Sequence, residues 1–390
     1  MKAANLFVAF ICIALFSASP SLASETIKVG AILAITGPAS NLGAPEARTL
    51  EMMVTEINKK GGIKGKKIEL IVKDSASSPE KAISFAKQLI EGDKVLAIIG
   101  PSTSGETMKI KNLAEEAKTI LLSCAAAETI VNPVAKYVFK TPQKDSYAVI
   151  RIFEQMNKMK LTKLGVLSSN TGFGKAGKDQ IEKLAEGHGI KIVSSEVYDK
   201  AATDLTAEVT KVKSSGAEAI LNWSIEPAQS IVIKNARQIG FKGPIFQSHG
   251  FGNINYVKAA GVAAEGVIFP AGRLLIADVL PGNNPQKKLL MGYKKQYEAK
   301  FGEEASTFGG HGYDAMLILT KAIEKANSTD TEAVRSAIEG LKGVVGIGGV
   351  FNFTAQDHNG LAIDSFEMLT VKNGKFVLLA QKPEPKKKKK

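Results

Sequence analysis

Three consecutive hydroxyl residues follow an apolar run in the segment Val95 to Thr107, VLAIIGPSTSGET. Ser102, Thr103 and Ser104 stand where the run stops and a helix is predicted to begin. The first N–H groups of a helix have no partner inside it, so hydroxyls at this point can complete a site for a carboxylate or phosphate. Thr103 and Glu106 also fit a capping box, in which the hydroxyls serve the helix alone. The sequence therefore predicts an anion-binding loop or a helix cap.

A second motif, Gly172-Phe173-Gly174-Lys175-Ala176-Gly177, matches the dinucleotide fingerprint G-x-G-x-x-G, with Glu196 about twenty residues later. Two observations argue against a nicotinamide cofactor. The chain begins with an export signal, described below, and the motif opens the second predicted unit of the fold instead of the first. The favoured interpretation is a tight strand-to-helix loop that projects Phe173 into a cleft, and no cofactor is expected.

Other residues with catalytic or metal-binding chemistry are scattered. The histidines, which show neither His-x-x-x-His nor Glu-x-x-His spacing, are His188, His249, His311 and His358. No G-x-S-x-G motif occurs, and Cys124 has no histidine near it in sequence. We therefore expect no metal site and no enzyme; an exported hydrolase is an alternative only if the fold brings distant residues together.

Residues 1–23, MKAANLFVAFICIALFSASPSLA, have the charged start, apolar core and small-x-small ending of a secretory signal peptide, cleaved near Ala23. Cys12 lies inside the apolar core, so a lipoprotein is not expected. The predicted location is the periplasm, and no later apolar run is long enough to cross a membrane. Cys124 is then the only mature cysteine, which excludes an intrachain disulfide.

The formal net charge of +13 does not indicate a nucleic-acid partner. Lys2 and the terminal run Lys386 to Lys390 account for six of these charges, which leaves +7. The other charges alternate in sign along stretches such as Lys109 to Lys118, which is typical of solvated helix faces. Residues 381–390 are predicted to be a disordered lysine-rich tail, with weak attraction to anionic lipid headgroups as the alternative.

Strands and helices alternate from Thr26 onward, which favours parallel α/β units. The expected strands are 27–33, 67–73, 95–99 and 120–123, then 163–167, 190–197, 218–222 and 244–247. After residue 286 the rhythm changes to three helical segments and a terminal hairpin turning at Asn373-Gly374. The fold class is therefore α/β, with two Rossmann-like lobes joined by a multi-strand hinge and a ligand cleft between them.

The expected lobes are discontinuous in sequence, because the last section has too few strands for a sheet of its own. The first lobe comprises 24–142 and about 273–350, and the second comprises 143–272 and about 351–380. Crossovers are expected near Thr141-Pro142, Pro270 to Arg273 and Val350 to Phe353. Ligands of open α/β sheets bind beyond the carboxyl ends of the strands. The loops at these ends are 41–43, 102–104, 125–127, 171–173, 223–226 and 247–251.

From about Ile27 to Leu379 the chain resembles the periplasmic substrate-binding proteins of branched-chain amino-acid ABC importers, of the leucine/isoleucine/valine type. The resemblance rests on KVGAILAITGPASNLG, INKKGGIKGKKIELIVKDSASSP, IIGPSTS, ILLSCAAAETI, Phe173-Gly174 and GYDAML from Gly312. It implies a type I periplasmic binding protein fold, a small-molecule ligand, and membrane permease subunits with their ATPases as partners. It also implies a monomer that binds by lobe closure.

The resemblance also implies a ligand site. Ser104 and the loop with Ala125 and Ala127 hold the ligand's carboxylate, and Phe173 closes over it from the second lobe. Leu42 stands where amino-acid binders carry tyrosine, and Ala127 stands where the family often has a hydroxyl. The further candidates are Ser102, Trp223, Ile225 and Glu226.

One departure from the family bears on the ligand. Amino-acid-binding members have a glutamate in the loop 247–250 that pairs with the ligand's ammonium, and His249 occupies that position here. A buried ammonium without a carboxylate partner costs several kcal/mol. The hypothesis is a small carboxylate with an apolar body and no α-ammonium. Branched-chain or related amino acids are the conventional interpretation, with Glu226 or Asp314 as sources of the missing charge. A ligand-sensing module of a signalling receptor is the rival role.

Overall fold

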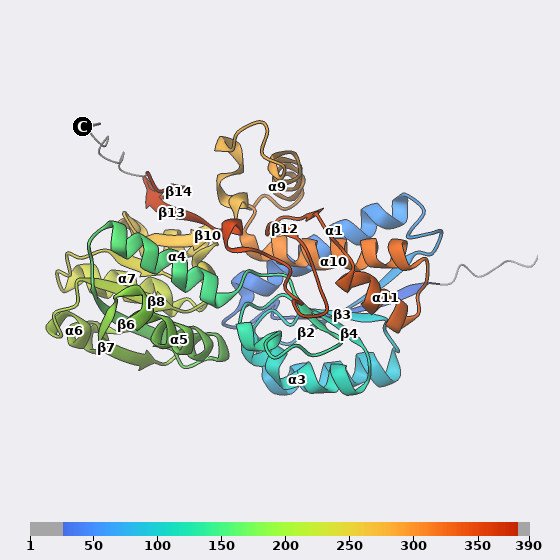
Figure 1. The fold of residues 1–390 in the computed structure, drawn as a ribbon, viewed down its shortest axis with the longest axis horizontal. Coiled ribbons are helices and arrows are strands. Elements are labelled where there is room, and N and C mark those ends of the chain that lie inside the picture. The colour runs from blue at the N-terminus through green and yellow to red at the C-terminus, as the bar shows by residue number, and fades with distance from the viewer. Residues whose placement is uncertain (1–25, 381–390) are drawn as a thin grey trace, which may run out of the picture.

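The computed structural model describes residues 26–380, which form two lobes side by side (Figure 1). The predicted signal peptide, with Cys12, and the predicted lysine-rich tail lie outside the described residues. Each lobe is built on one sheet flanked by helices. The expected α/β class with two lobes is confirmed, and all eight expected strands occur with ends within two residues of those expected.

The first sheet is parallel and has the order β2-β1-β3-β4-β5. Its strands are β1 (Ile27–Leu33), β2 (Ile68–Asp74), β3 (Ala97–Ile99), β4 (Ile120–Ser123) and β5 (Val138–Lys140). Every residue of β3, β4 and β5 is buried, because helices cover both faces, as the uninterrupted apolar runs predict. The helices of this lobe are α1 (Ser40–Lys59), α2 (Pro79–Lys87), α3 (Ser104–Glu116), α10 (Thr307–Ala326) and α11 (Thr331–Glu339).

The second sheet has the order β14-β13-β10-β9-β8-β6-β7. Its strands are β6 (Lys163–Ser169), β7 (Lys191–Tyr198), β8 (Ala219–Trp223), β9 (Ile245–Gln247), β10 (Ile268–Ala271), β13 (Glu367–Lys372) and β14 (Lys375–Leu378). The terminal hairpin adds antiparallel to β10 and turns at Asn373-Gly374, as expected. The helices are α4 (Asp145–Lys158), α5 (Gly172–Ala185), α6 (Thr206–Ser214), α7 (Ala228–Gln238) and α8 (Ile254–Ala260).

The chain passes between the lobes three times. The first crossover follows β5, and the second follows β10 into a 3-10 helix, η6 (Arg273–Val279), and α9 (Lys287–Phe301). The third lies later than the expected boundary at 351. Phe351, Phe353 and Leu361 pack in the core of the first lobe, together with the short hairpin β11 (Val344–Val345) and β12 (Val350–Phe351), so the chain returns to the second sheet only after Leu361.

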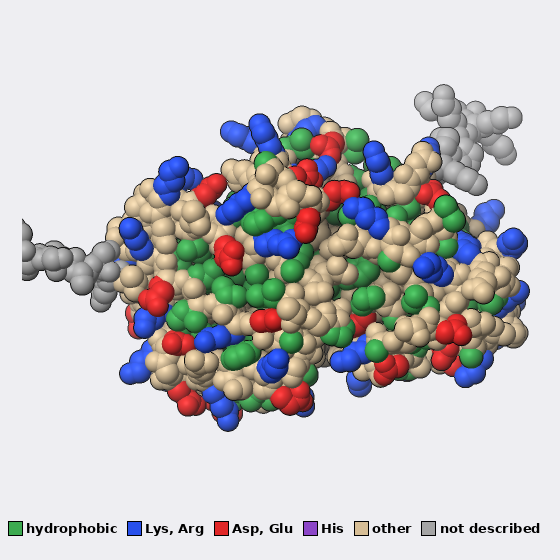
Figure 2. Space-filling model, turned by 180° about the vertical axis from the view of Figure 1, so that it is seen from behind, with side chains coloured by type: hydrophobic (Ala, Val, Ile, Leu, Met, Phe, Trp, Pro, Cys, Tyr) green, Lys and Arg blue, Asp and Glu red, His purple; other side chains and the backbone are tan. Residues whose placement is uncertain are grey.

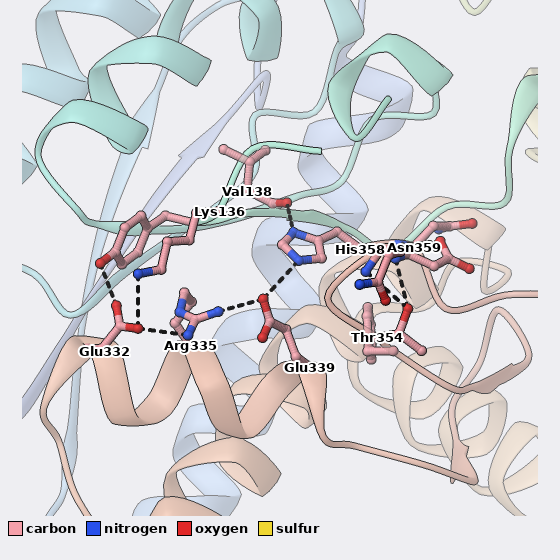
Figure 3. A network of polar contacts seen from close by, with 12 residues as sticks. Lys136, Val138, Glu332, Arg335, Glu339, Thr354, His358 and Asn359 are labelled. Carbon is pink, nitrogen blue, oxygen red and sulfur yellow. Dashed lines mark hydrogen bonds and ion pairs between the residues drawn. The ribbon is translucent and has the colours of Figure 1, made fainter. Parts of the chain in front are cut away.

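A polar network fixes the end of β5 where the first crossover begins (Figure 3). His358 lies between two acceptors, with Nδ1 2.9 Å from the carbonyl oxygen of Val138 and Nε2 3.2 Å from a carboxylate oxygen of Glu339. Asn359 donates to the carbonyl oxygen of Pro142 at 2.7 Å. Further ion pairs along α11 join Lys136, Glu332 and Arg335. The crossover therefore starts from a firmly held strand end.

Basic and acidic side chains are interspersed over the face shown in Figure 2. This agrees with the alternating charges along the helical stretches of the sequence. No helix among residues 26–380 is long and apolar enough to span a bilayer.

Candidate functional site

A cavity of about 20 Å³ lies between the lobes, beyond the carboxyl ends of strands from both sheets. It is lined by Leu42, Ser102, Ser104, Cys124, Ala125, Ala126, Pro142, Phe173, Ile225, His249, Gly250, Phe308 and His311. Seven of the ten residues predicted from the sequence are in this set. The space accommodates about one water molecule, so an amino-acid-sized ligand needs a wider lobe separation or rotated side chains.

In the loop 102–104, one hydroxyl residue caps the helix and another lines the cavity. Thr103 caps α3, because its hydroxyl accepts the N–H of Glu106 at 3.3 Å and donates to the Glu106 carboxylate at 2.5 Å. Ser104 lines the cavity, and its oxygen accepts the N–H of Ala127 at 3.2 Å. The hydroxyl proton of Ser104 is therefore left to donate into the cavity, beside the positive end of the α3 dipole. Thr103 is therefore the helix cap, and Ser104 is the candidate donor to an anion.

Ser102 also lines the cavity, but its hydroxyl is already occupied. It accepts the N–H of Ala34 at 3.0 Å and donates to the buried carboxyl of Glu46. Burial raises the pKa of Glu46 well above its usual range, with the Ser102 bond acting in the opposite direction. Ser102 therefore joins the loop after β1 to α1.

The loop after β4 shapes the cavity wall, but the backbone N–H groups of Ala125 and Ala127 are already hydrogen-bonded. Ala125 lines the cavity, and its N–H donates to the Ser123 hydroxyl at 3.1 Å. Ala127 does not line the cavity, and its N–H donates to the Ser104 hydroxyl. The backbone N–H groups of Ala125 and Ala127 are thus both engaged within the lobe.

The G-x-G-x-x-G segment is a packing motif. Thr171 caps α5 by accepting the N–H of Gly174 at 3.1 Å, and this turn places Phe173 against the cavity. A β-carbon at Gly174 would lie 1.9 Å from the carbonyl oxygen of Ser169, and one at Gly177 would lie 2.0 Å from the indole nitrogen of Trp223. Close backbone approach therefore explains these glycines.

His249 is the polar group of the second lobe in the cavity wall. Its ring meets those of Phe173, Trp223 and Phe366 edge-on, at centroid distances of 5.5 to 5.6 Å. Neither ring nitrogen has a hydrogen-bond partner, and Nε2 lies 3.6 Å from Oδ1 of Asp145. Burial, followed by the positive charge of Lys140, lowers the pKa of His249 well below its usual value, so the ring is neutral.

Sequence reasoning missed His311, Asp145 and Lys140. His311 projects from α10 into the cavity wall, where burial lowers its pKa to about 3. Asp145, in the first turn of α4, is fully buried, and burial raises the pKa of its carboxyl to about 7 against the opposing effects of Lys140 and a backbone hydrogen bond from Glu128. Lys140, at the end of β5, is also fully buried and donates to the carbonyl oxygens of Ala126 and Gln143. These three titratable residues were missed because they stand in segments without a chemical motif, and their burial cannot be read from the sequence.

Two further predicted residues, Trp223 and Glu226, do not line the cavity. Trp223 is fully buried behind Phe173 and His249. Glu226 turns back to its own loop, where it accepts from the Ser224 hydroxyl at 2.7 Å and the Ile225 N–H at 3.2 Å. It instead lines a separate depression of about 200 Å³ that adjoins the cavity through Phe173 and Ile225.

Asp314 does not line the cavity either. Its two oxygens accept the N–H groups of Ile347 and Gly348 at 2.6 and 2.7 Å. Among residues 26–380, no group of three or more His, Cys, Asp or Glu residues is arranged to hold a metal ion.

The lobes touch on both sides of the cavity. The Asn253 side chain donates to the carbonyl oxygen of Asn41 at 3.0 Å, and Asn255 donates to the side-chain oxygen of Asn41 at 3.3 Å. On the other side, the backbone of Gly172 lies against that of Gly105. The two lobes are therefore in direct contact beside the cavity as well as joined by the crossovers.

Comparison with known proteins gives a consistent result. The model of a family described as periplasmic binding protein matches residues 26–375. The leucine-, isoleucine-, valine-, threonine-, and alanine-binding protein of Pseudomonas aeruginosa is 26% identical over 325 residues, covering 82% of this chain and 84% of that protein.

Two solved structures show the same fold. An extracellular ligand-binding receptor from Rhodopseudomonas palustris HaA2 has a TM-score of 0.86 and 28% identity, and the match covers 91% of this chain and 100% of that one. A branched-chain amino acid transporter substrate binding protein from Streptococcus pneumoniae, in complex with isoleucine, has a TM-score of 0.79 and 26% identity, covering 90% and 98%. The chain therefore belongs to the periplasmic binding protein family, whose members here are solute-binding proteins and not enzymes.

Proposed function

We propose that this protein is an extracytoplasmic solute receptor that delivers a small carboxylate, of the branched-chain or related amino-acid class, to an ABC importer by lobe closure. The observation that carries the proposal is the cavity between the lobes, where the Ser104 hydroxyl, whose oxygen accepts the N–H of Ala127, stands at the start of α3 among apolar side chains. Once the lobes separate or side chains rotate to widen the cavity, Ser104 can donate to a carboxylate, while Leu42, Ile225 and Phe308 offer contacts to an aliphatic body.

The names of the relatives support the amino-acid class. The Pseudomonas aeruginosa relative is named for five amino acids, and the Streptococcus pneumoniae structure contains isoleucine. We further propose export to the periplasm through the signal peptide 1–23, with permease subunits as partners of the closed form. The crossovers near Thr141-Pro142, after β10 and after Leu361 are the segments that absorb the rotation on opening.

A second candidate is a carboxylate without an ammonium, such as an aromatic or short aliphatic acid. His249 favours it, because the family glutamate that pairs with the ammonium is absent from the loop 247–250. The rival role is that of a ligand-sensing module, in which a signalling receptor, instead of an importer, responds to the closed lobes.

The test is a ligand screen on the mature chain from residue 24 onward, unfolded and refolded to remove any ligand acquired during expression. Amino acids, their 2-oxo analogues, and aromatic and short aliphatic acids are compared by thermal shift and titration calorimetry. We expect a ligand with a carboxylate to raise the melting temperature, to bind in the micromolar range or tighter, and to be recovered unchanged. Failure of every carboxylate, or conversion of the ligand to a product, would refute the proposed function.

A further inference from the structure

A second hollow lies between residues 52–60, at the end of α1, and residues 285–296, at the start of α9. We call it the α1–α9 groove. It shares no residue with the cavity between the lobes, and α9 lies at the edge of the molecule (Figure 1). Its volume of about 590 Å³ is within the range of sites that bind small molecules, roughly 300–1,000 Å³. The groove is therefore large enough for a ligand that the cavity of about 20 Å³ does not hold.

The walls of the α1–α9 groove are mostly apolar. Met52, Met53 and Ile57 contribute to it from α1, and Leu289 faces them from α9. Met53, Ile57 and Leu289 are only half-buried, so apolar surface is available to an occupant. Methionine side chains are flexible and polarisable, and they adapt to apolar bodies of different shape. These walls suit an aliphatic or aromatic body.

Two tyrosines add a hydrogen-bond donor to the groove. The rings of Tyr293 and Tyr313 meet edge-on at a centroid distance of 5.4 Å. The Tyr293 hydroxyl is paired with that of Thr49 at 2.8 Å, whereas the Tyr313 hydroxyl has no hydrogen bond to any residue among 26–380. Burial, followed by the charges of Asp314 and Glu56, raises the pKa of Tyr313 to about 12, so the phenol stays protonated and can donate.

Gly292, in the middle of α9, lines the groove and has an unusual environment. A β-carbon on Gly292 would meet no atom within 4 Å, whereas every other glycine inside an α-helix of residues 26–380 would have a neighbour within that distance. Glycine weakens a helix interior relative to alanine, and close packing within the chain does not explain it here. The bare backbone instead lets an occupant of the groove approach α9 closely.

The charged residues of the groove favour an anion. Lys60 and Lys288 line it together with Glu56, which leaves one excess positive charge. Neither lysine ammonium has an ion-pair partner among residues 26–380. A second copy of the chain would bring the same excess positive charge to a symmetric interface. Charge complementarity therefore favours a small anion over a second copy.

We propose that the α1–α9 groove is a second binding site, separate from the cavity between the lobes, for a small amphiphilic carboxylate. The apolar body lies against Met53, Ile57 and Leu289 and beside Gly292. The carboxylate accepts from the Tyr313 hydroxyl or from the ammonium of Lys60 or Lys288. The inference does not depend on the ligand of the cavity.

The probes are octanoate, 1-octanol and octylammonium, which share one apolar body and differ in charge. Each is titrated calorimetrically against the mature chain, refolded as in the ligand screen. We expect octanoate to bind with a dissociation constant of about 1 mM or lower. The alcohol should bind about threefold more weakly and the ammonium about tenfold more weakly, because the lysines no longer attract the ligand.

Substitutions at Gly292 locate the site. Gly292→Leu places a side chain in the groove and should weaken octanoate binding at least about tenfold, while Gly292→Ala should weaken it less. Ala299→Leu is the matched control, because Ala299 is an exposed residue of α9 outside the groove. Ser104→Ala, which alters the cavity between the lobes, should leave octanoate binding unchanged. Melting temperatures verify that each variant folds.

Substitutions of the lysines test the charge preference. Lys60→Gln and Lys288→Gln should each weaken octanoate binding about threefold and leave 1-octanol binding unchanged. Lys295→Gln removes an exposed charge of α9 outside the groove and should have no effect on either ligand. These variants also provide the measurement if Gly292→Leu fails to fold.

Several outcomes would overturn the inference. They are absence of octanoate binding, tighter binding of octylammonium, and octanoate binding that Ser104→Ala abolishes but Gly292→Leu preserves. A dimer in sedimentation velocity that Gly292→Leu dissociates would assign the groove to a second copy instead. Failure of every ligand in the screen for the cavity would refute the proposed function, while octanoate binding that is lost in Gly292→Leu would still support the groove.

Discussion

Gly105 and Gly172 meet backbone to backbone across the cleft, and the contact is asymmetric. A β-carbon on Gly172 would lie 2.7 Å from the Cα of Gly105, a distance at which one of the lobes must move. A β-carbon on Gly105 would have its nearest neighbour at 3.7 Å, an ordinary contact. The first glycine of the G-x-G-x-x-G motif therefore packs directly against the backbone at the start of α3.

Gly172→Ala should hinder lobe closure without disturbing either lobe. Overpacking of this kind costs about 1–3 kcal/mol, which corresponds to a five- to 150-fold weaker ligand affinity. The measurement is calorimetry with the ligand found in the screen, with the melting temperature of the free protein as a check on folding. Gly105→Ala is the matched control and should bind nearly as the wild type does. Equal affinity of Gly172→Ala and Gly105→Ala would contradict this account of closure.

Ser104→Ala and Ser102→Ala should differ in their effect on ligand affinity. Loss of the Ser104 hydroxyl removes a donor to the ligand's carboxylate and should weaken affinity about tenfold, and it also lowers the free energy of unfolding because the buried N–H of Ala127 loses its partner. Ser102→Ala leaves Glu46 and the N–H of Ala34 without a partner, and should lower the free energy of unfolding by about 1–3 kcal/mol. Denaturant unfolding and calorimetry on both variants check this division. Retained affinity in Ser104→Ala would exclude it from the ligand site.

Trp223, the single tryptophan of the chain, should report ligand binding through its fluorescence. Its ring is 5.6 Å, centroid to centroid, from both Phe173 and His249, which line the cavity. Displacement of either ring by a ligand changes the surroundings of the indole, so the emission should change in intensity or wavelength and saturate with the calorimetric affinity. Ligands that raise the melting temperature without altering the emission would show that these rings stay in place.

Affinity should fall in acid partly through His311. The closed cavity holds the pKa of His311 at about 3, through burial and then the charge of Lys140. Opening exposes the ring and returns its pKa towards about 6.5, so the open form binds more protons below that pH. Lowering the pH from 7 to 5 therefore favours the open form and weakens binding.

Other buried groups near the cavity also titrate, so the contribution of His311 is obtained by comparing the pH dependence of Kd in the wild type and in His311→Gln. His249, with its lowered pKa, acts in the same direction, whereas Asp145, with its raised pKa, opposes it. His311→Gln should reduce the slope of log Kd against pH, between pH 5 and 6.5, by up to about one. Identical slopes in wild type and variant would mean that His311 keeps its protonation state on closure.

The parallel strands were predictable because each is an apolar run buried on both faces, as in β3 and β4. Strands β5, β10, β11 and β12 were missed, and β11 and β12 have only two residues each. β5 has three residues and ends in a lysine, and β10 contains Pro270, which suggested a crossover. The expected boundary at 351 was too early, because Phe351 and Phe353 join the first core through tertiary packing that has no local signal.

The cavity wall was largely predictable for a different reason. Loops after parallel strands meet at one edge, so Ser104, Phe173 and His249 were placed together by topology. His311 comes from the second turn of α10, where the sequence shows only helical periodicity. The burial of Asp145 depends on how α4 packs behind the loop that contains His249, and this arrangement is not encoded in any spacing.

The bonds from Asn253 and Asn255 to Asn41 make the strength of binding adjustable without touching the ligand. They exist only when the lobes are together, so they set the fraction of molecules that are closed before any ligand arrives. A change at Asn255 would multiply the affinity for every ligand by one common factor, while the ranking among ligands stays with the cavity. Under the proposed closure, a substitution at Asn255 would therefore shift all affinities together and leave the ligand preference unchanged.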